Sequence, residues 1–190
     1  MGNSPLFQRM KDMYFTPKTG VPAVLREGTM GEAIFIVVIG ILVSVVSDLI
    51  APLGETAASF SVVFLANALG NVFAWVVGTF IFYVLGKSLG GRGDYRTLFM
   101  MMGFSTSLGI FTGIIDMVFG VIGAQVSLRL AISGFFAVWQ ILILFYIVRE
   151  TMKLTTGKAV TVAVVPVLVV ILGLLFLAAQ YHVNSGHFPL

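Results

Sequence analysis

The stretch GEAIFIVVIGILVSVVSDLIA at residues 31–51 has only two charged side chains, Glu32 and Asp48, in a run long enough to cross a membrane. It is the first of five such runs, which cover residues 31–51, 58–85, 98–122, 128–148 and 159–180. A helix needs about 20 apolar residues to cross a hydrocarbon core of ~30 Å. Because the runs are continuous rather than divided into alternating segments of about ten residues, they predict helices and not barrel strands. The sequence therefore predicts an all-α integral membrane protein with five transmembrane helices in a compact bundle.

The composition leaves little chain outside the membrane. Charged residues make up 10% of the sequence, against about 25% in an average soluble protein. The remaining pieces are an arm of residues 1–30, short connections and a tail of residues 181–190. No soluble catalytic or nucleic-acid-binding domain fits in them, and we expect neither an enzyme, nor catalytic residues, nor a nucleic-acid partner.

No cofactor or metal is expected either. The chain has no cysteine, which excludes thiolate ligands, and His182 and His187 stand in the tail without carboxylates beside them. Structural and catalytic metal sites need three or four such ligands in a fixed geometry. The two histidines therefore do not predict a metal site.

The basic residues predict the orientation of the chain. Ten of the eleven lysines and arginines lie in the arm and in the second and fourth connections, and Arg129 is the exception. Cytoplasmic loops collect Lys and Arg. The pattern predicts a cytoplasmic N-terminus and an outer C-terminus, with the plasma (inner) membrane as the location.

The N-terminal arm predicts a helix at the membrane surface. In residues 5–15, Leu6, Met10 and Met13 recur at helical spacing with charged residues between them, which is typical of an amphipathic helix in the headgroup region. Residues 16–22 contain two prolines and predict a turn. The arm either anchors the first span at a fixed depth, the interpretation we favour, or serves as a docking segment.

Polar residues in the first three runs lie on stripes of small residues, which allow helices to approach closely. The candidate intramembrane site consists of Asp48, Asn67, Asn71 and Asp116. A buried charge costs at least about 2.5–3.5 kcal/mol at mid-bilayer, so Asp116 needs an explanation. One is an ion pair with Arg129; the other is a ligand, ion or proton site shared with the rest of the group. The asparagines also fit simple interhelical hydrogen bonding.

The second connection, GKSLGGRGDYR at residues 86–96, is rich in glycine and basic. It lacks the spacing of a nucleotide-binding loop and follows a membrane helix rather than a strand. Lys87, Arg92 and Arg96 instead predict a contact with anionic lipid headgroups or with an acidic partner surface. A plain cytoplasmic turn is the simpler alternative.

Part of this connection resembles a known family. Leu-Gly-Gly-Arg-Gly-Asp-Tyr at residues 89–95, with Leu98-Phe99 and Gly-Phe-Ser at residues 103–105, is similar to the Yip family of Ypt/Rab-interacting proteins. Phe104 stands where tyrosine is usual, Gly109 lies near a common proline, and the arm is short, which suggests a prokaryotic-type member. The resemblance implies trafficking scaffolds that bind Rab-type GTPases in eukaryotes, and no agreed activity in prokaryotes.

Two functions remain as hypotheses. The first is a non-enzymatic Yip-type membrane scaffold or adaptor that acts through lipid and helix–helix contacts, with lipids, a second copy of the chain or a cytoplasmic protein as partners. The second is a small transporter or channel with a polar path around Asp116. Whether the polar stripes surround a cavity or close on one another separates the two.

Overall fold

The computed structural model describes residues 5–50, 60–122 and 125–184, and this part of the chain is helical without strands. The helices are α1 (Leu6–Phe15), α2 (Pro17–Glu27), α3 (Met30–Ile50), α4 (Phe60–Ser88), α5 (Tyr95–Ser105), α6 (Ser107–Val121), α7 (Val126–Met152) and α8 (Thr156–Asn184). Four helical segments of the described chain are long and apolar enough to cross a membrane, and α8 begins with a shorter apolar segment, Thr156–Val170. The prediction of an all-α membrane protein is confirmed.

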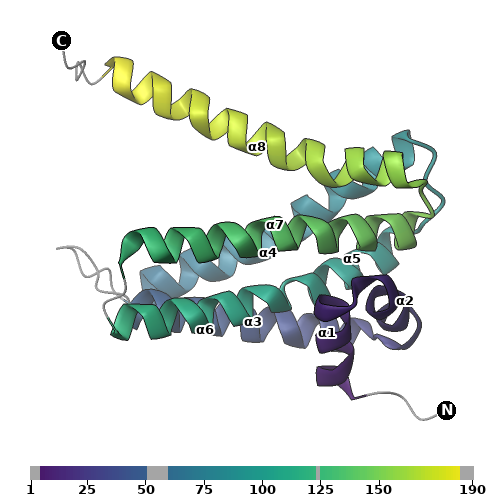
Figure 1. Ribbon diagram of the computed structural model, residues 1–190, viewed down its shortest axis with the longest axis horizontal. Coiled ribbons are helices and arrows are strands. Elements are labelled where there is room, and N and C mark those ends of the chain that lie inside the picture. The colour runs from purple at the N-terminus through teal and green to yellow at the C-terminus, as the bar shows by residue number, and fades with distance from the viewer. Residues whose placement is uncertain (1–4, 51–59, 123–124, 185–190) are drawn as a thin grey trace.

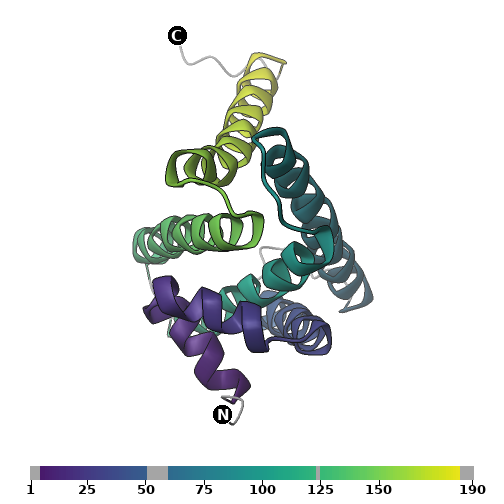
Figure 2. The same ribbon diagram turned by 90° about the vertical axis from the view of Figure 1, so that its right-hand side faces the viewer.

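Helices α3 to α8 run roughly along one axis, and α1 and α2 pack across one end of the bundle (Figure 1). Helix α3 contacts α4, α5 and α6, and α7 contacts α5, α6 and α8. Figure 2 shows the bundle from the end that carries α1 and α2. Helix α8 is close to α7 near their connection and diverges from it toward the C-terminus (Figure 1).

The third span is broken into two helices, whereas the sequence predicts one continuous helix over 98–122. Helix α5 ends at Ser105 and α6 begins at Ser107. Three consecutive side-chain hydroxyl groups donate hydrogen bonds to the backbone here. Those of Ser105, Thr106 and Ser107 each donate to the carbonyl oxygen three residues earlier, over 2.5–2.7 Å. Such local bonds compete with the helical ladder, which accounts for the break.

Tyr14 of α1 reaches this break from outside the bundle. Its hydroxyl lies 3.2 Å from the carbonyl oxygen of Phe104, 3.3 Å from that of Ser105 and 2.5 Å from Ser107 Oγ. Inside a membrane protein, backbone carbonyls that leave a helix must find partners within the protein. Tyr14 supplies one, and its ring is only 4% exposed. Burial raises the pKa of the Tyr14 hydroxyl, so it stays protonated as a donor.

The arm forms a packed helical hairpin rather than one surface helix followed by a turn. Residues 17–22, where the two prolines predict a turn, belong to α2. Pro17 occupies the first turn of that helix, where no N–H group is needed. The helices cross at Gly20, where an added Cβ would lie 2.2 Å from the carbonyl oxygen of Asp12. Met13 of α1 is fully buried in the core.

A partly buried ion pair ties this hairpin to the first span. The Arg9 guanidinium forms an ion pair with Glu32 and donates to the carbonyl oxygen of Glu27 over 2.5 Å. Glu32 also accepts from the backbone N–H of Thr29 over 2.9 Å, while Thr29 Oγ1 accepts from the N–H of Glu32 over 3.2 Å. This reciprocal arrangement is a capping box at the start of α3. Glu32 therefore has a structural role.

Replacing Tyr14 by phenylalanine should remove the donor at the break and leave the ring in place. Leaving a buried polar group without its partner costs about 1–3 kcal/mol, so we expect the free energy of unfolding in mixed micelles to fall by that amount. Tyr83→Phe is the control, because the ring contacts of Tyr83 do not involve its hydroxyl. Equal stability of the Tyr14 and Tyr83 variants would contradict the role assigned to Tyr14.

The same comparison has a pH signature. Above pH ~10, an exposed tyrosine in the unfolded chain releases its proton, while folded Tyr14 retains it because burial raises its pKa. The folded state then binds more protons than the unfolded state, so stability falls as the pH rises above ~10. The fall should be steeper for the unmodified protein than for Tyr14→Phe.

Candidate functional site

The basic residues gather at the end of the bundle that carries α1 and α2. The connections from α4 to α5 and from α7 to α8 lie at this same end (Figure 1). Together with the hairpin and the adjoining helix turns, they hold ten of the eleven lysines and arginines. We call Lys87, Arg92 and Arg96, with the connection between α4 and α5, the basic platform.

The basic platform is fixed to the neighbouring connection by close backbone contact. The N–H of Arg92 donates to the carbonyl oxygen of Met152 over 2.9 Å, and Lys158 Nζ donates to the carbonyl oxygen of Leu89 over 2.7 Å. At Gly93 an added Cβ would lie 2.3 Å from the carbonyl oxygen of Thr151. The glycine-rich sequence is therefore required by packing, and the loop between α4 and α5 is held in one place.

The side chains of the platform differ in their surroundings. Lys87 Nζ lies 5.5 Å from the centre of the Tyr83 ring, within the range of a cation–π contact. Arg92 and Arg96 are exposed, and among the described residues neither forms an ion pair. Their guanidinium groups are available to an anion, and guanidinium groups bind phosphate through paired hydrogen bonds.

Asp94 is the one acidic residue of the platform. It precedes α5, and its side chain accepts from the backbone N–H of Thr97 over 2.8 Å. Hydrogen bonds from the Thr97 side chain and backbone hold the pKa of Asp94 below its ordinary value. Asp94 thus serves as the N-cap of α5.

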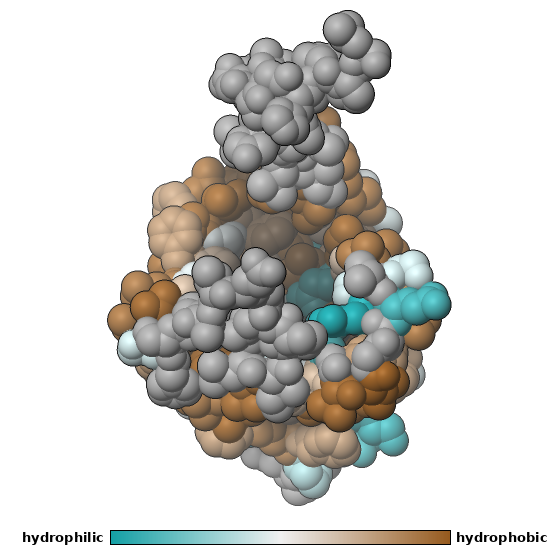
Figure 3. Space-filling model, turned by 90° about the vertical axis from the view of Figure 1, so that its left-hand side faces the viewer, coloured by the Kyte–Doolittle hydropathy of each residue, from teal (hydrophilic) through white to brown (hydrophobic). Residues whose placement is uncertain are grey.

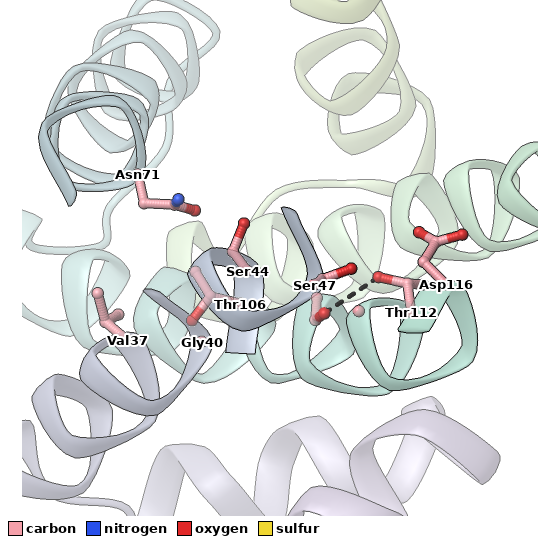
Figure 4. A pocket seen from close by; sticks show the side chains of 10 residues that line it. Val37, Gly40, Ser44, Ser47, Asn71, Thr106, Thr112 and Asp116 are labelled. Atoms are coloured by element: carbon pink, nitrogen blue, oxygen red, sulfur yellow. Dashed lines mark hydrogen bonds between the residues drawn. The ribbon is translucent and has the colours of Figure 1, made fainter. Parts of the chain in front are cut away.

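The polar stripes of the first three spans surround a cavity in the other half of the bundle. A cavity of about 240 Å³ lies between α3, α4 and α6. Figure 4 shows the polar side chains around it, which belong to Ser44, Ser47, Asn71, Thr106, Thr112 and Asp116. A second cavity of about 390 Å³ between α4, α6 and α7 shares Asn71, Thr106 and Asp116 and adds Ser133 and Gln140.

This polar cavity lies toward the end opposite the basic platform. Figure 3, which shows that opposite end, has a hollow with hydrophilic side chains in and beside it. The lining begins at Val37 on α3 and Thr106 on the third span. Closer to the platform, the third span is filled by buried side chains, among them Leu98 and Phe104. The cavity is therefore closed by the core on the platform side.

The structure brings together some of the residues that the sequence groups as a site. Asp116 and Asn71 line both cavities. Asn67 accepts from Ser44 Oγ over 2.7 Å and lines a shallow pocket beside Asn71, whose Nδ2 donates to the Asn67 carbonyl oxygen over 2.9 Å. The side chain of Asp48 lies outside the described residues.

Among the described residues, no ion pair joins Asp116 to Arg129. Within the described part of the chain, the ion pairs are Arg9–Glu32 and Arg149–Glu150. Thr106 and Ser133 also line the cavity, although the sequence does not single them out. The run of three hydroxyl residues at 105–107 is the signal that would have pointed to Thr106, because such a run disturbs a helix.

These features define a helical integral membrane protein with a basic end, a broken third span and a polar hollow at the opposite end. The family model of the Yip1 domain matches residues 11–178, most of the chain, and the protein belongs to this family. The resemblance seen in residues 89–105 is confirmed. No curated protein and no solved structure matches the chain.

Gly93→Ala should destabilise the platform, because the new methyl group would meet backbone atoms of Thr151 and Met152. Overpacking of this kind costs about 1–3 kcal/mol of stability. We expect a loss at the upper end of this range for Gly93→Ala, because the contacts are with backbone atoms. Gly157→Ala is the control, since an added Cβ there meets nothing within 4 Å. Thermal unfolding in detergent measures both. Loss of stability at Gly157 alone would contradict the packing of the platform.

Proposed function

We propose that this protein is a non-enzymatic Yip-type membrane adaptor whose basic platform binds an anionic surface. The observation that supports this most is the fixed platform itself: Arg92 and Arg96 stand exposed on a loop whose backbone is bonded to the connection after α7. A surface whose backbone is already ordered loses less conformational freedom on binding.

The proposed orientation follows from the charges. Ten basic residues lie at the platform end, and cytoplasmic segments of membrane proteins are enriched in Lys and Arg. We therefore place the N-terminus in the cytoplasm and the C-terminus outside, in the plasma (inner) membrane. The platform then faces the headgroups of the cytoplasmic leaflet, which carry negative charge.

Anionic lipid is the first partner to consider. A basic residue close to an anionic leaflet contributes about 1 kcal/mol, and the attraction decays within a Debye length. A cytoplasmic protein with an acidic surface would use the same residues, and a second copy of the chain would use the exposed apolar helix faces.

Arg92→Gln with Arg96→Gln should weaken the binding of the protein to anionic vesicles. Two charges at about 1 kcal/mol each correspond to roughly thirtyfold weaker binding at low salt. The protein is held in nanodiscs of zwitterionic lipid, and its flotation with phosphatidylglycerol vesicles is measured. Arg92→Lys with Arg96→Lys is the matched control, which keeps the charge. Unchanged binding of the glutamine variant would rule out the platform as the contact.

A second candidate function, a small transporter or channel, is favoured by one observation: the polar stripes surround a cavity instead of closing on one another. Asp116 lines this cavity and, among the described residues, has no ion-pair partner. Ionisable residues inside a membrane bundle are functional candidates because their burial is costly. The closed platform side would have to open for a solute to pass.

Asp116→Asn should abolish solute flux if the cavity is part of a pathway. Proteoliposomes with the purified protein are tested for movement of protons, monovalent and divalent cations, and we expect at least a tenfold loss of flux in the variant because the cation loses its counter-charge. Asp12→Asn in α1 is the control, because it makes the same replacement of a carboxylate by an amide outside the cavity. Folded, reconstituted protein that shows no flux would exclude this candidate and leave the adaptor proposal.

A further inference from the structure

A separate apolar cavity of about 390 Å³ lies where the N-terminal hairpin meets the sixth and seventh helices. Most of its wall is aromatic: Tyr14 and Phe15 of α1, Phe111 of α6, and Phe135 and Trp139 of α7, with Ile115 one turn beyond Phe111. It shares no residue with the first cavity beside Asp116, and shares Leu108 and Phe136 with the second. Its chemistry is therefore that of a site for hydrocarbon.

The aromatic rings give this apolar cavity ordered walls. Phe135 and Trp139 stack with their centres 6.1 Å apart and their planes 16° from parallel, and Tyr14 meets Phe111 edge to face at 6.1 Å. The rim faces the surroundings, since Phe15 is 77% exposed and Phe135 is 62% exposed. An apolar hollow open on the side of a membrane bundle is within reach of lipid chains.

The exposed face of α1 carries a charge beside this opening. Phe7, Lys11 and Phe15 are exposed and recur every four residues, so they lie on one stripe of the helix. The nearby acid, Asp12, accepts from Gln8 Nε2 over 2.8 Å and forms no ion pair with Lys11 among the described residues. Lysine on such a helix extends its ammonium group toward headgroups while aromatic neighbours rest in the apolar layer.

We infer that the apolar cavity binds one acyl chain of an anionic phospholipid, with the phosphate of that lipid beside Lys11. The chain lies against Phe111 and Ile115 on one side and against the stacked rings of α7 on the other. Charge complementarity with Lys11 and the position of α1 across the end of the bundle select a lipid over a peptide or a soluble ligand. The site does not depend on the basic platform or on Asp116.

A lipid in this site contacts the residue that holds the broken span. The ring of Tyr14 forms part of the wall, and its hydroxyl lies at the junction of α5 and α6. An acyl chain in the site would therefore add contacts to the ring that positions this hydroxyl.

The test uses the full chain in nanodiscs that contain phosphatidylglycerol with a photoactivatable diazirine on the acyl chain. After illumination, mass spectrometry identifies the labelled peptides. We expect residues 108–115 and 135–139 to be labelled several-fold more than α8, and this labelling to saturate at about one probe per protein at a low mole fraction of probe. Saturation of the labelling distinguishes binding at a defined site from contact with bulk lipid, and it is measured on the unmodified protein.

Variants then locate the site. Ile115→Trp should fill the cavity and lower labelling of these peptides several-fold, whereas Val169→Trp, at a position on α8 that is 63% exposed, should not. Lys11→Gln should lower labelling by the phosphatidylglycerol probe to the level of a phosphatidylcholine probe. Labelling that does not saturate and spreads evenly over the exposed helix faces would overturn the site. Equal labelling by both probes in the unmodified protein would overturn the anionic headgroup.

Discussion

The break in the third span imposes a requirement that the rest of the structure satisfies. At residues 104–105 two carbonyl groups lie next to an interrupted helical ladder, and backbone groups inside a membrane protein cannot rely on bulk water. Tyr14 and the hydroxyl of Ser107 provide their partners. Tyr14 can do so only if the N-terminal hairpin is docked, which is consistent with the burial of Met13 and Tyr14 on the inner face of α1.

The docked hairpin in turn depends on two close contacts. Gly20 lets α2 cross α1 at backbone distance, and the ion pair of Arg9 with Glu32 ties α1 to the start of α3. Buried ion pairs contribute little net stability but penalise any arrangement that separates them. The pair therefore fixes the position of the hairpin relative to α3 more than it strengthens the fold. This refines the interpretation of the arm as an anchor for the first span.

The sequence predicts the parts of this structure that follow from local pattern. Long apolar runs predict the helices, and the distribution of Lys and Arg predicts which connections share one end of the bundle. The second arm helix is missed because two prolines suggest a turn, although Pro17 at a helix start costs nothing. Among the candidate site residues, Asn71 and Asp116 each lie on a stripe of small residues, and the structure brings both to one cavity. An ion pair of Asp116 with Arg129 depends on the distance between two helices, and spacing along the chain does not encode that distance.

The carboxyl group of Asp116 needs polar surroundings, which accounts for the difference between the open polar cavity and the packed platform side. A carboxylate enclosed by apolar helices without a cation would carry a heavy desolvation penalty, and no ion pair of Asp116 with Arg129 is present among the described residues. Hydroxyl and amide groups around the cavity, including those of Ser47, Thr112 and Asn71, lower that penalty because they offer polar contacts and space for water. Helices α3, α4 and α6 consequently cannot close on one another along their whole length without isolating the charge. The bundle is packed where its side chains are apolar and hollow around Asp116, so the polar cavity lies apart from the basic platform.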